Sequence, residues 1–243
     1  MNAIILAAGK GKRLRPLTND KPKCLVELFG KPLLEWQIET FQNSGITDIT
    51  IVSGYKSDLI NFPETTILKN EKYDSTNMVE TLFYAKEKML DSTIVSYGDI
   101  IFEKNVLNKL IQSKADFSII VDKNWKRYWE MRFDNPLNDS ESLKIDTDGN
   151  ITSIGKKVQK IDEIEGQYIG LMKFQNVGLE KIKEFYEKTK SQSTNESNPL
   201  NPLVSFQQSF MTDFLQGLIN DGCKLKAIEI ENGWLELDTI SDY

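Results

Sequence analysis

Histidine is absent from the 243 residues of this chain. Its absence excludes Ser-His-Asp and Cys-His nucleophile systems, zinc or haem sites ligated by histidine, and histidine as a general base. Any catalysis must therefore depend on carboxylates, lysines, arginines, backbone amides or hard metal ions.

Cysteine and long hydrophobic runs are also scarce. Cys24 and Cys223 lie far apart and belong to no C-x-x-C motif, so we expect reduced thiols rather than a disulfide scaffold. No stretch approaches the ~18 apolar residues of a membrane span, and the N-terminal apolar run is too short for a signal peptide. We expect a cytoplasmic protein without a membrane partner.

Charge is unevenly distributed along the chain. The total is −6, which argues against a nucleic-acid partner. Residues 1–31 nevertheless carry +5, which leaves −11 on the remainder. This concentration suggests a polyanionic ligand, with triphosphate as the first candidate, although a solvated basic loop without a ligand is the alternative.

Short apolar runs alternate with helical patterns through the first half, which predicts a mostly parallel sheet covered on both faces. The expected strands are 3–7, 49–53, 66–69, 93–97, 117–121, 143–145, 151–154, 168–174, 225–230 and 234–237. The expected helices are 32–44, 76–89 with Ser75 or Thr76 as N-cap, 178–188 and 209–221. Residues 124–139 are interpreted as irregular and 190–202 as a mobile polar loop.

A glycine-rich turn follows the first strand, where backbone N–H groups can approach an anion. It is not a dinucleotide fingerprint, because Leu14 stands where the third glycine belongs. It is not a Walker A loop either, because Arg13 follows Lys12.

Three carboxylates are candidate metal ligands. Asp99 follows a strand at the sheet edge where α/β proteins bind ligands, and Glu236 and Asp238 share one strand face. Together they would form an all-oxygen site suited to Mg²⁺. A simple turn at Asp99 and a solvated strand edge at the other two are the alternatives.

The motif L-A-A-G-x-G-x-R-L-x-P-L-T at 6–18, followed by Lys21-Pro22-Lys23, resembles the signature loop of nucleotidylyltransferases that activate sugar and choline phosphates. The resemblance implies one Rossmann-like α/β domain over 1–243, with a nucleotide-binding half (1–121) and an acceptor-binding half (122–243). Arg13 and Lys23 would be catalytic, holding the leaving and the reacting phosphates respectively. The implied nucleotide-binding residues are Leu6, Ala7, Ala8, Gly9, Gly11, Lys12, Arg13, Lys23, Gly54, Tyr55 and Asn77.

Two features resemble the cytidylyltransferase branch. Tyr73-x-x-x-Asn77 is similar to bacterial cytidylyltransferases that act on small phosphorylated amino compounds, and Asn77 would lie at a helix N-terminus suited to anions. Simple capping is the alternative. Glu236-x-Asp238 is similar to the choline-phosphate branch, which implies CTP as the nucleotide and Mg²⁺ as the cofactor.

The middle region is similar to a narrower group, the phosphoglutamine cytidylyltransferases of bacterial capsule phosphoramidate synthesis, at 121–125, 132–137, 155–157 and 167–171. This implies a phosphorylated acceptor, L-glutamine phosphate first and then phosphocholine or 2-aminoethylphosphonate, for cell-surface polysaccharide decoration. The candidate acceptor residues are Arg132 for a carboxylate, Lys156 for the phosphate, and Trp125, Trp129 or Tyr168 for an ammonium group. The aromatic residues could equally be packing anchors.

Two other functions remain open at this point. A hexose-1-phosphate nucleotidylyltransferase would share the loop, but the aromatic middle region and the Glu236-x-Asp238 pair argue against it. A non-catalytic nucleotide-binding regulatory module would not need Lys23 and Asp99 intact.

We also expect an exposed region around Phe206–Phe214 to be available for a homodimer.

Overall fold

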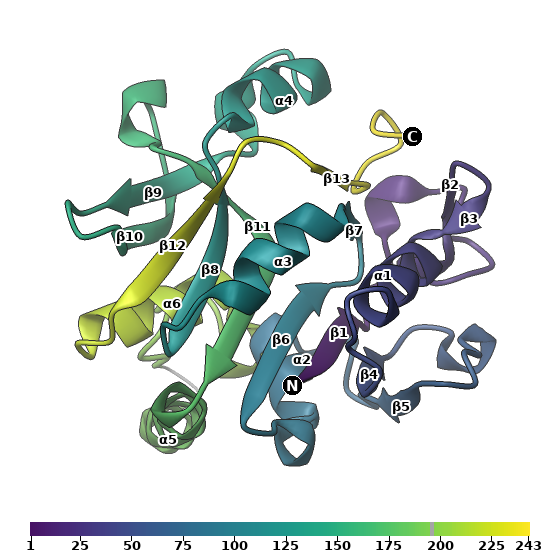
Figure 1. Cartoon of the computed structure of the whole chain (residues 1–243), viewed down its shortest axis with the longest axis horizontal. Coiled ribbons are helices and arrows are strands. Elements are labelled where there is room, and N and C mark those ends of the chain that lie inside the picture. The colour runs from purple at the N-terminus through teal and green to yellow at the C-terminus, as the bar shows by residue number, and fades with distance from the viewer. Residues whose placement is uncertain (195–196) are drawn as a thin grey trace.

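The computed structural model describes residues 1–194 and 197–243. The strands of its main sheet are β1 Asn2–Ala7, β4 Ile49–Ser53, β5 Thr66–Lys69, β6 Ser92–Tyr97, β8 Phe117–Asp122, β9 Glu141–Ile145, β10 Asn150–Lys157, β11 Gln167–Gln175 and β12 Leu225–Ile230. Within the described residues their order is β5-β4-β1-β6-β11-β8-β12-β10-β9 (Figure 1). The first four are parallel, and β11 runs antiparallel to both β6 and β8. The expected α/β class with a mostly parallel sheet is confirmed.

Alternation along the strands divides the core between the two faces of the sheet. In β1, Ile4 and Leu6 belong to one buried cluster, whereas Ala3, Ile5 and Ala7 belong to the other. The helices are α1 Leu33–Gln42, α2 Met78–Tyr84, α3 Lys104–Gln112, α4 Trp125–Arg132, α5 Val177–Gln192 and α6 Met211–Asn220. α2, α5 and α6 cover the first cluster and α1, α3 and α4 cover the second, with α1 and α3 in front of the sheet in Figure 1.

The helix predicted at 76–89 is shorter in the structure and has a different cap. Asn77 is the N-cap, and its side-chain oxygen accepts from the amide of Met78 at 2.9 Å. The expectation that Ser75 or Thr76 caps this helix is therefore wrong.

The prediction that 124–139 is irregular is also wrong, because α4 lies within it. Trp125 and Trp129 are four residues apart, share one helix face, and are both 4% exposed. Their rings pack edge to face at 6.0 Å. Truncating either side chain to alanine would lower the free energy of unfolding by about 3–5 kcal/mol. The same aromatic residues that made the helix hard to predict therefore anchor it in the core.

Helical structure and side-chain hydrogen bonds hold much of the segment 190–202, which the sequence predicts to be a mobile loop. Residues 190–192 complete α5, and the Asn198 side chain donates to the Val204 carbonyl and the Ser209 hydroxyl at 3.2 and 2.9 Å. Residues 195–196 of the predicted loop lie outside the described residues.

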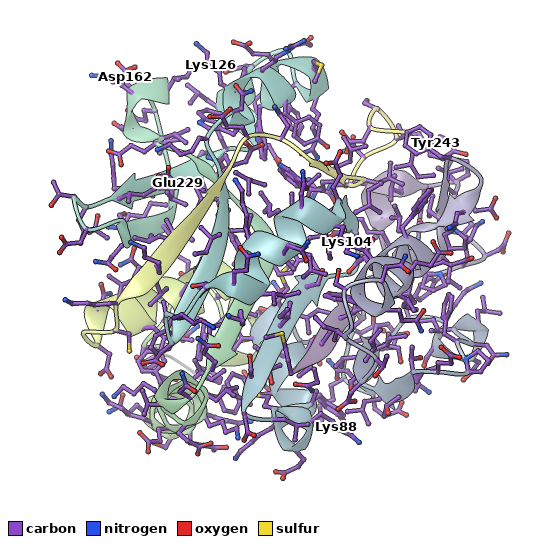
Figure 2. The ribbon with its side chains drawn as sticks, viewed as in Figure 1. Lys88, Lys104, Lys126, Asp162, Glu229 and Tyr243 are labelled. Carbon is purple, nitrogen blue, oxygen red and sulfur yellow. The ribbon has the colours of Figure 1, made fainter. Side chains whose placement is uncertain are left out.

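In the region expected to be available for a homodimer, Phe206 and Phe214 are buried in the core, whereas Phe210 between them is 47% exposed. The homodimer therefore stays a prediction. Charged side chains such as Lys126 and Asp162 project from the periphery (Figure 2). No helix in the described part of the chain combines the length and apolar character that crossing a bilayer demands.

Candidate active site

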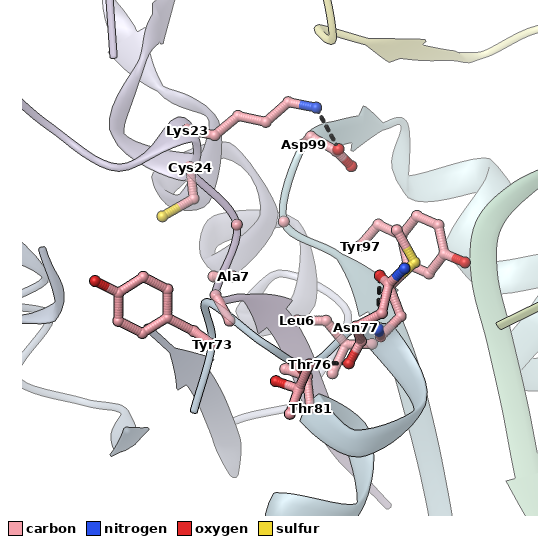
Figure 3. A pocket seen from close by; sticks show the side chains of 14 residues that line it. Leu6, Ala7, Lys23, Cys24, Tyr73, Thr76, Asn77, Thr81, Tyr97 and Asp99 are labelled. Atoms are coloured by element: carbon pink, nitrogen blue, oxygen red, sulfur yellow. Dashed lines mark hydrogen bonds and ion pairs between the residues drawn. The ribbon is translucent and has the colours of Figure 1, made fainter. Parts of the chain in front are cut away.

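A cavity lies where β1 and β6 end, and we call it the strand-end cavity (Figure 3). Its lining is Leu6, Ala7, Ala8, Gly9, Lys23, Cys24, Tyr73, Thr76, Asn77, Met78, Thr81, Tyr97, Gly98 and Asp99. Seven of the predicted site residues are therefore brought together at this edge. Thr76, Met78, Thr81 and Tyr97 were not predicted as site residues, because they reach the cavity only through the packing of α2 and β6, whereas Tyr73 belongs to the Tyr73-x-x-x-Asn77 motif.

The glycine-rich turn folds back over Lys23. Gly11 has a φ of +58°, and a Cβ there would lie 2.9 Å from the Lys23 Cβ. A residue with a side chain would be strained at this φ and would displace Lys23. The Thr18 hydroxyl donates to the Gly11 carbonyl at 2.8 Å, which holds the turn in this position.

The Lys23 ammonium lies between two carboxylates. Its Nζ is 2.5 Å from Asp99 Oδ2 and 2.6 Å from Asp238 Oδ1, and its side chain is 12% exposed. Burial alone would lower the pKa of Lys23, but the two carboxylates outweigh that effect and raise it above its ordinary value. Lys23 therefore remains a cation at neutral pH.

Residues distant in sequence meet here because β13 (Trp234–Glu236) pairs antiparallel with β7 (Ile100–Phe102). Glu236 lies opposite Ile100, and the Leu237 amide donates to the Asp99 carbonyl at 3.0 Å. This short ladder carries Asp238 to the carboxyl end of β6 beside Asp99.

Asp99 offers an oxygen to a hard divalent cation, and Asp238, whose two oxygens contact Lys23 and Arg13, is the carboxylate beside it. Asp99 Oδ1 is buried and has no hydrogen-bond partner among the described residues, an arrangement that normally requires explanation. A carboxylate oxygen left free in this way is suited to Mg²⁺, which prefers oxygen ligands.

The predicted three-carboxylate site is not preformed. Within residues 1–194 and 197–243, no group of three His, Cys, Asp or Glu side chains is arranged to hold a metal ion. Glu236 Oε2 instead accepts from Arg132 at 2.6 Å. Burial and the nearby Asp99 raise the pKa of Glu236, although Arg132 opposes them.

Arg132 occupies a different position from the one expected for an acceptor-binding residue. Besides Glu236 it contacts Asp242 through Nε at 2.8 Å and through its second terminal nitrogen at 3.2 Å, and its side chain is 4% exposed. Two carboxylates of the chain already pair with Arg132, so the expectation that it binds an acceptor carboxylate is wrong.

The basic segment is partly neutralised by acids from elsewhere in the chain. Lys10 pairs with Asp74, and Arg13 contacts Asp238. Lys12 is exposed. The local excess of positive charge is therefore smaller in three dimensions than along the sequence.

Gly54 and Tyr55 follow β4 beside the signature loop. The Tyr55 amide donates to the Ala8 carbonyl at 3.2 Å, and the Tyr55 ring lies 6.4 Å from the ring of Tyr73, which does line the cavity. Gly54 and Tyr55 therefore contact the loop and the cavity wall, and neither is among the described residues that line the cavity.

A second cavity adjoins the first, and we call it the aromatic-acidic cavity. Met78 and Tyr97 line both cavities. Its full lining is Met78, Tyr97, Trp129, Asp139, Glu141, Gln167, Tyr168, Ile169, Gly170, Phe210, Thr212, Trp234 and Glu236. Arg132 pairs with Glu236, and Arg13 lies 3.7 Å from Asp139, so Glu141 is the lining carboxylate that has no ion pair within the described residues. This carboxylate and the aromatic rings around it suit a cationic ligand.

Glu141 is the acidic residue of this cavity that sequence reasoning missed. The residue as a whole is exposed, but desolvation of its carboxyl group raises its pKa, and the negative charges of Asp213 and Asp139 raise it further. No ion pair of Glu141 occurs within the described residues. In the sequence, Glu141 is marked only by its position before the predicted strand 143–145, and that position does not indicate a cavity.

Tyr97 separates the two cavities, and its position depends on β11. A Cβ at Gly170, where φ is +82°, would lie 2.5 Å from the Tyr97 ring, so glycine makes room for it. The Tyr97 and Tyr168 rings pack edge to face at 5.7 Å, and burial raises the pKa of both hydroxyls. Both therefore remain neutral hydrogen-bonding groups.

Of the other predicted acceptor residues, Trp129 and Tyr168 line this cavity. Trp129 Nε1 is a buried donor without a partner in the described part of the chain. Trp125 is a packing anchor in the core, so the expectation that it faces a ligand is wrong. Lys156 is exposed on β10 and is absent from the described lining of both cavities.

The fold and the strand-end site define a nucleotidyltransferase. Residues 3–160 match the family described as the MobA-like NTP transferase domain, and the chain belongs to that family. Over its whole length it is 43% identical to the CTP:phosphoglutamine cytidylyltransferase of Campylobacter jejuni subsp. jejuni serotype O:2, of which it covers 97%. Over 46% of its length it is 38% identical to the choline-phosphate cytidylyltransferase of Streptococcus pneumoniae, of which it covers 51%.

A solved structure shares the fold. The CTP:phosphocholine cytidylyltransferase from Streptococcus pneumoniae superposes with a TM-score of 0.74 at 23% identity, covering 100% of this chain and 95% of that one. The resemblance to nucleotidylyltransferases found in the sequence is confirmed.

Proposed function

We propose that this chain transfers the cytidylyl group of CTP to a small phosphorylated amino compound and releases pyrophosphate. The observation that carries the proposal is the Lys23 ammonium held between Asp99 and Asp238 at the strand-end cavity. The 43% identity over the full chain supports CTP as donor and L-glutamine phosphate as the first acceptor, before phosphocholine and 2-aminoethylphosphonate. The product would be an activated donor for cell-surface polysaccharide decoration.

The reaction needs no general base. An oxygen of the acceptor phosphate bonds to the α-phosphorus of CTP, and the bond from that phosphorus to the pyrophosphate oxygen breaks with its electron pair. The attacking oxygen is already anionic near neutral pH, so the absence of histidine is no obstacle. The difficulty is repulsion, because the reactants together carry roughly six negative charges.

Positive charge and fixed position are therefore what the protein must supply. Lys23 stays protonated and would neutralise charge at the reacting phosphates, while Arg13 would hold the leaving β- and γ-phosphates. Backbone amides of the turn from Ala8 to Gly11 can face the triphosphate. Mg²⁺, held by Asp99 and Asp238, would supply further neutralisation of the triphosphate.

The aromatic-acidic cavity would bind the acceptor. Its carboxylates Asp139 and Glu141 and the rings of Tyr168 and Trp129 suit an ammonium group. The strand-end lining comes from residues 6–99, and most of the aromatic-acidic lining comes from residues 129–236, which supports a nucleotide half followed by an acceptor half.

A pyrophosphate-release matrix tests this function. Four nucleoside triphosphates are assayed with Mg²⁺ against L-glutamine phosphate, phosphocholine, 2-aminoethylphosphonate and glucose 1-phosphate. We expect release with CTP and at least one amino acceptor. Release only with glucose 1-phosphate would instead assign a hexose-1-phosphate nucleotidylyltransferase, and no release with any pair would favour a non-catalytic module.

A further inference from the structure

Asp242 lies outside both cavities, and its carboxylate makes two sets of contacts. Oδ2 accepts from the backbone amides of Asp238 and Thr239 at 2.9 and 2.7 Å. Arg132 donates to Oδ1 through Nε at 2.8 Å and to Oδ2 at 3.2 Å. The Asp242 side chain is 3% exposed, so these bonds are shielded from solvent and from salt.

The amide contacts fix the backbone from which the Asp238 side chain projects. Asp238 lies just beyond β13, where no strand pairing holds it, and its carboxylate must reach Lys23 at 2.6 Å. The Ile240 amide donates to the Arg13 carbonyl at 3.2 Å, so the same turn also lies against the signature loop. With Asp242 removed, two amides of this turn would lose their acceptor and the turn would be free to shift.

The contacts to Arg132 extend this effect to Glu236. The third nitrogen of the same guanidinium donates to Glu236 Oε2 at 2.6 Å. The guanidinium is enclosed by the rings of Tyr128, Trp129 and Phe133, with its carbon 5.0–5.3 Å from their centroids. Because a planar guanidinium in a fixed enclosure can satisfy only one arrangement of partners, Asp242 and Glu236 set one another's positions.

We propose that Asp242 is a positioning residue, which holds the backbone of Asp238 through two amides so that its carboxylate stays beside Lys23 and Asp99, and which holds Glu236 in the wall of the aromatic-acidic cavity through Arg132. The inference rests on the proposed function, because it concerns how that site is held in shape. Groups that orient a metal-binding carboxylate typically change metal affinity or activity by about 10–100-fold when they are altered.

The test uses two substitutions of the full chain and a matched control. Asp242→Asn keeps one oxygen to accept from an amide but loses the charge that pairs with Arg132, whereas Asp242→Ala loses both. Asp162→Asn changes an exposed aspartate on another part of the surface (Figure 2). Folding of each variant is checked by circular dichroism and thermal unfolding.

Two readouts do not depend on turnover. Amide hydrogen exchange at Asp238 and Thr239 reports whether the turn is held, and Mn²⁺ titration followed by electron paramagnetic resonance reports the metal site. We expect exchange at both amides to accelerate at least tenfold in Asp242→Ala and less in Asp242→Asn. We expect Mn²⁺ affinity to fall by about 10–100-fold in both, with Asp162→Asn unchanged.

Turnover adds a third readout, in which kcat and the Mg²⁺ requirement should change more than the KM for the acceptor. Unchanged exchange and Mn²⁺ affinity in a folded variant would overturn the proposal. Lower thermal stability with unchanged Mn²⁺ affinity would also overturn it, because Asp242 would then be only structural. If the wild type lacks transferase activity, the proposed function fails while exchange and Mn²⁺ binding still decide the role of Asp242.

Discussion

Glu141 provides a direct test of how the acceptor is recognised. The pKa of Glu141 is raised to about 7, so at pH 8 the side chain is mostly ionised, and Glu141→Gln then removes a negative charge from the aromatic-acidic cavity while keeping nearly the same size and hydrogen-bonding oxygen. If Glu141 binds the acceptor ammonium, the variant should bind an amino acceptor less tightly. The chemical step should be almost unchanged, because Lys23 and Asp99 lie in the other cavity.

The size of the effect follows from the position of Glu141. A hydrogen bond to a charged group is worth about 1.5–3 kcal/mol, and solvent access at Glu141 favours the lower end. A loss of about 1.5 kcal/mol corresponds to roughly a tenfold rise in the KM for the acceptor. We expect kcat to stay within about twofold of wild type.

The assay follows pyrophosphate release at saturating CTP while the acceptor concentration is varied. L-glutamine phosphate is compared with its analogue that lacks the α-amino group, so that only the proposed contact differs. Glu184→Gln, an exposed glutamate on α5, is the matched control. The tenfold penalty should appear only for Glu141→Gln with the amino acceptor. Equal effects on both acceptors, or no effect on either, would refute the reasoning.

Three further predictions concern single side chains. Lys23→Ala should lower kcat by about 10²-fold or more in the same assay, since a charge-stabilising group is lost, and near wild-type turnover would contradict its assigned role. Burial, and then Lys114, lower the pKa of Lys173 to about 8 from an ordinary 10.5, so between these values the unfolded chain holds a proton that the folded chain has lost. The free energy of unfolding in urea should therefore rise from pH 8 to pH 10 by on the order of 2 kcal/mol relative to Lys173→Met, and parallel pH profiles would refute this. Burial also raises the pKa of Cys24 to about 12, so iodoacetamide should modify the less buried Cys223 first, as mass spectrometry of the peptides would show.

Sequence patterns predicted the sheet well because its strands are short runs rich in apolar and β-branched residues, whether they are fully buried like β4 or partly exposed at the sheet edge like β5. The expected strands 49–53, 66–69 and 225–230 agree residue for residue with β4, β5 and β12. Apolar runs of this kind are bounded by turn residues, so the local signal and the tertiary structure agree. The helix at Trp125–Arg132 was missed because its aromatic and charged composition hid the four-residue spacing of its tryptophans.

The candidate site was only partly predictable, for a different reason. Lys23 and Asp99 were accessible from the sequence because each lies in a motif beside a strand end. Glu141 and Asp242 carry no such signal, since their roles depend on which cavity or amide they reach after folding. Arg132 was assigned to the acceptor because its carboxylate partners, from the C-terminal segment, could not be inferred from spacing.

Phosphorus NMR of the complete reaction tests the central claim most directly. Wild-type protein, CTP, L-glutamine phosphate and Mg²⁺ are incubated together, and the spectrum is compared with that of Lys23→Ala. We predict two coupled resonances of a CDP-linked product and one pyrophosphate resonance for the wild type, formed about 10²-fold more slowly by the variant. CTP left intact, or cleaved to CMP and pyrophosphate with the acceptor unmodified, would contradict the assignment.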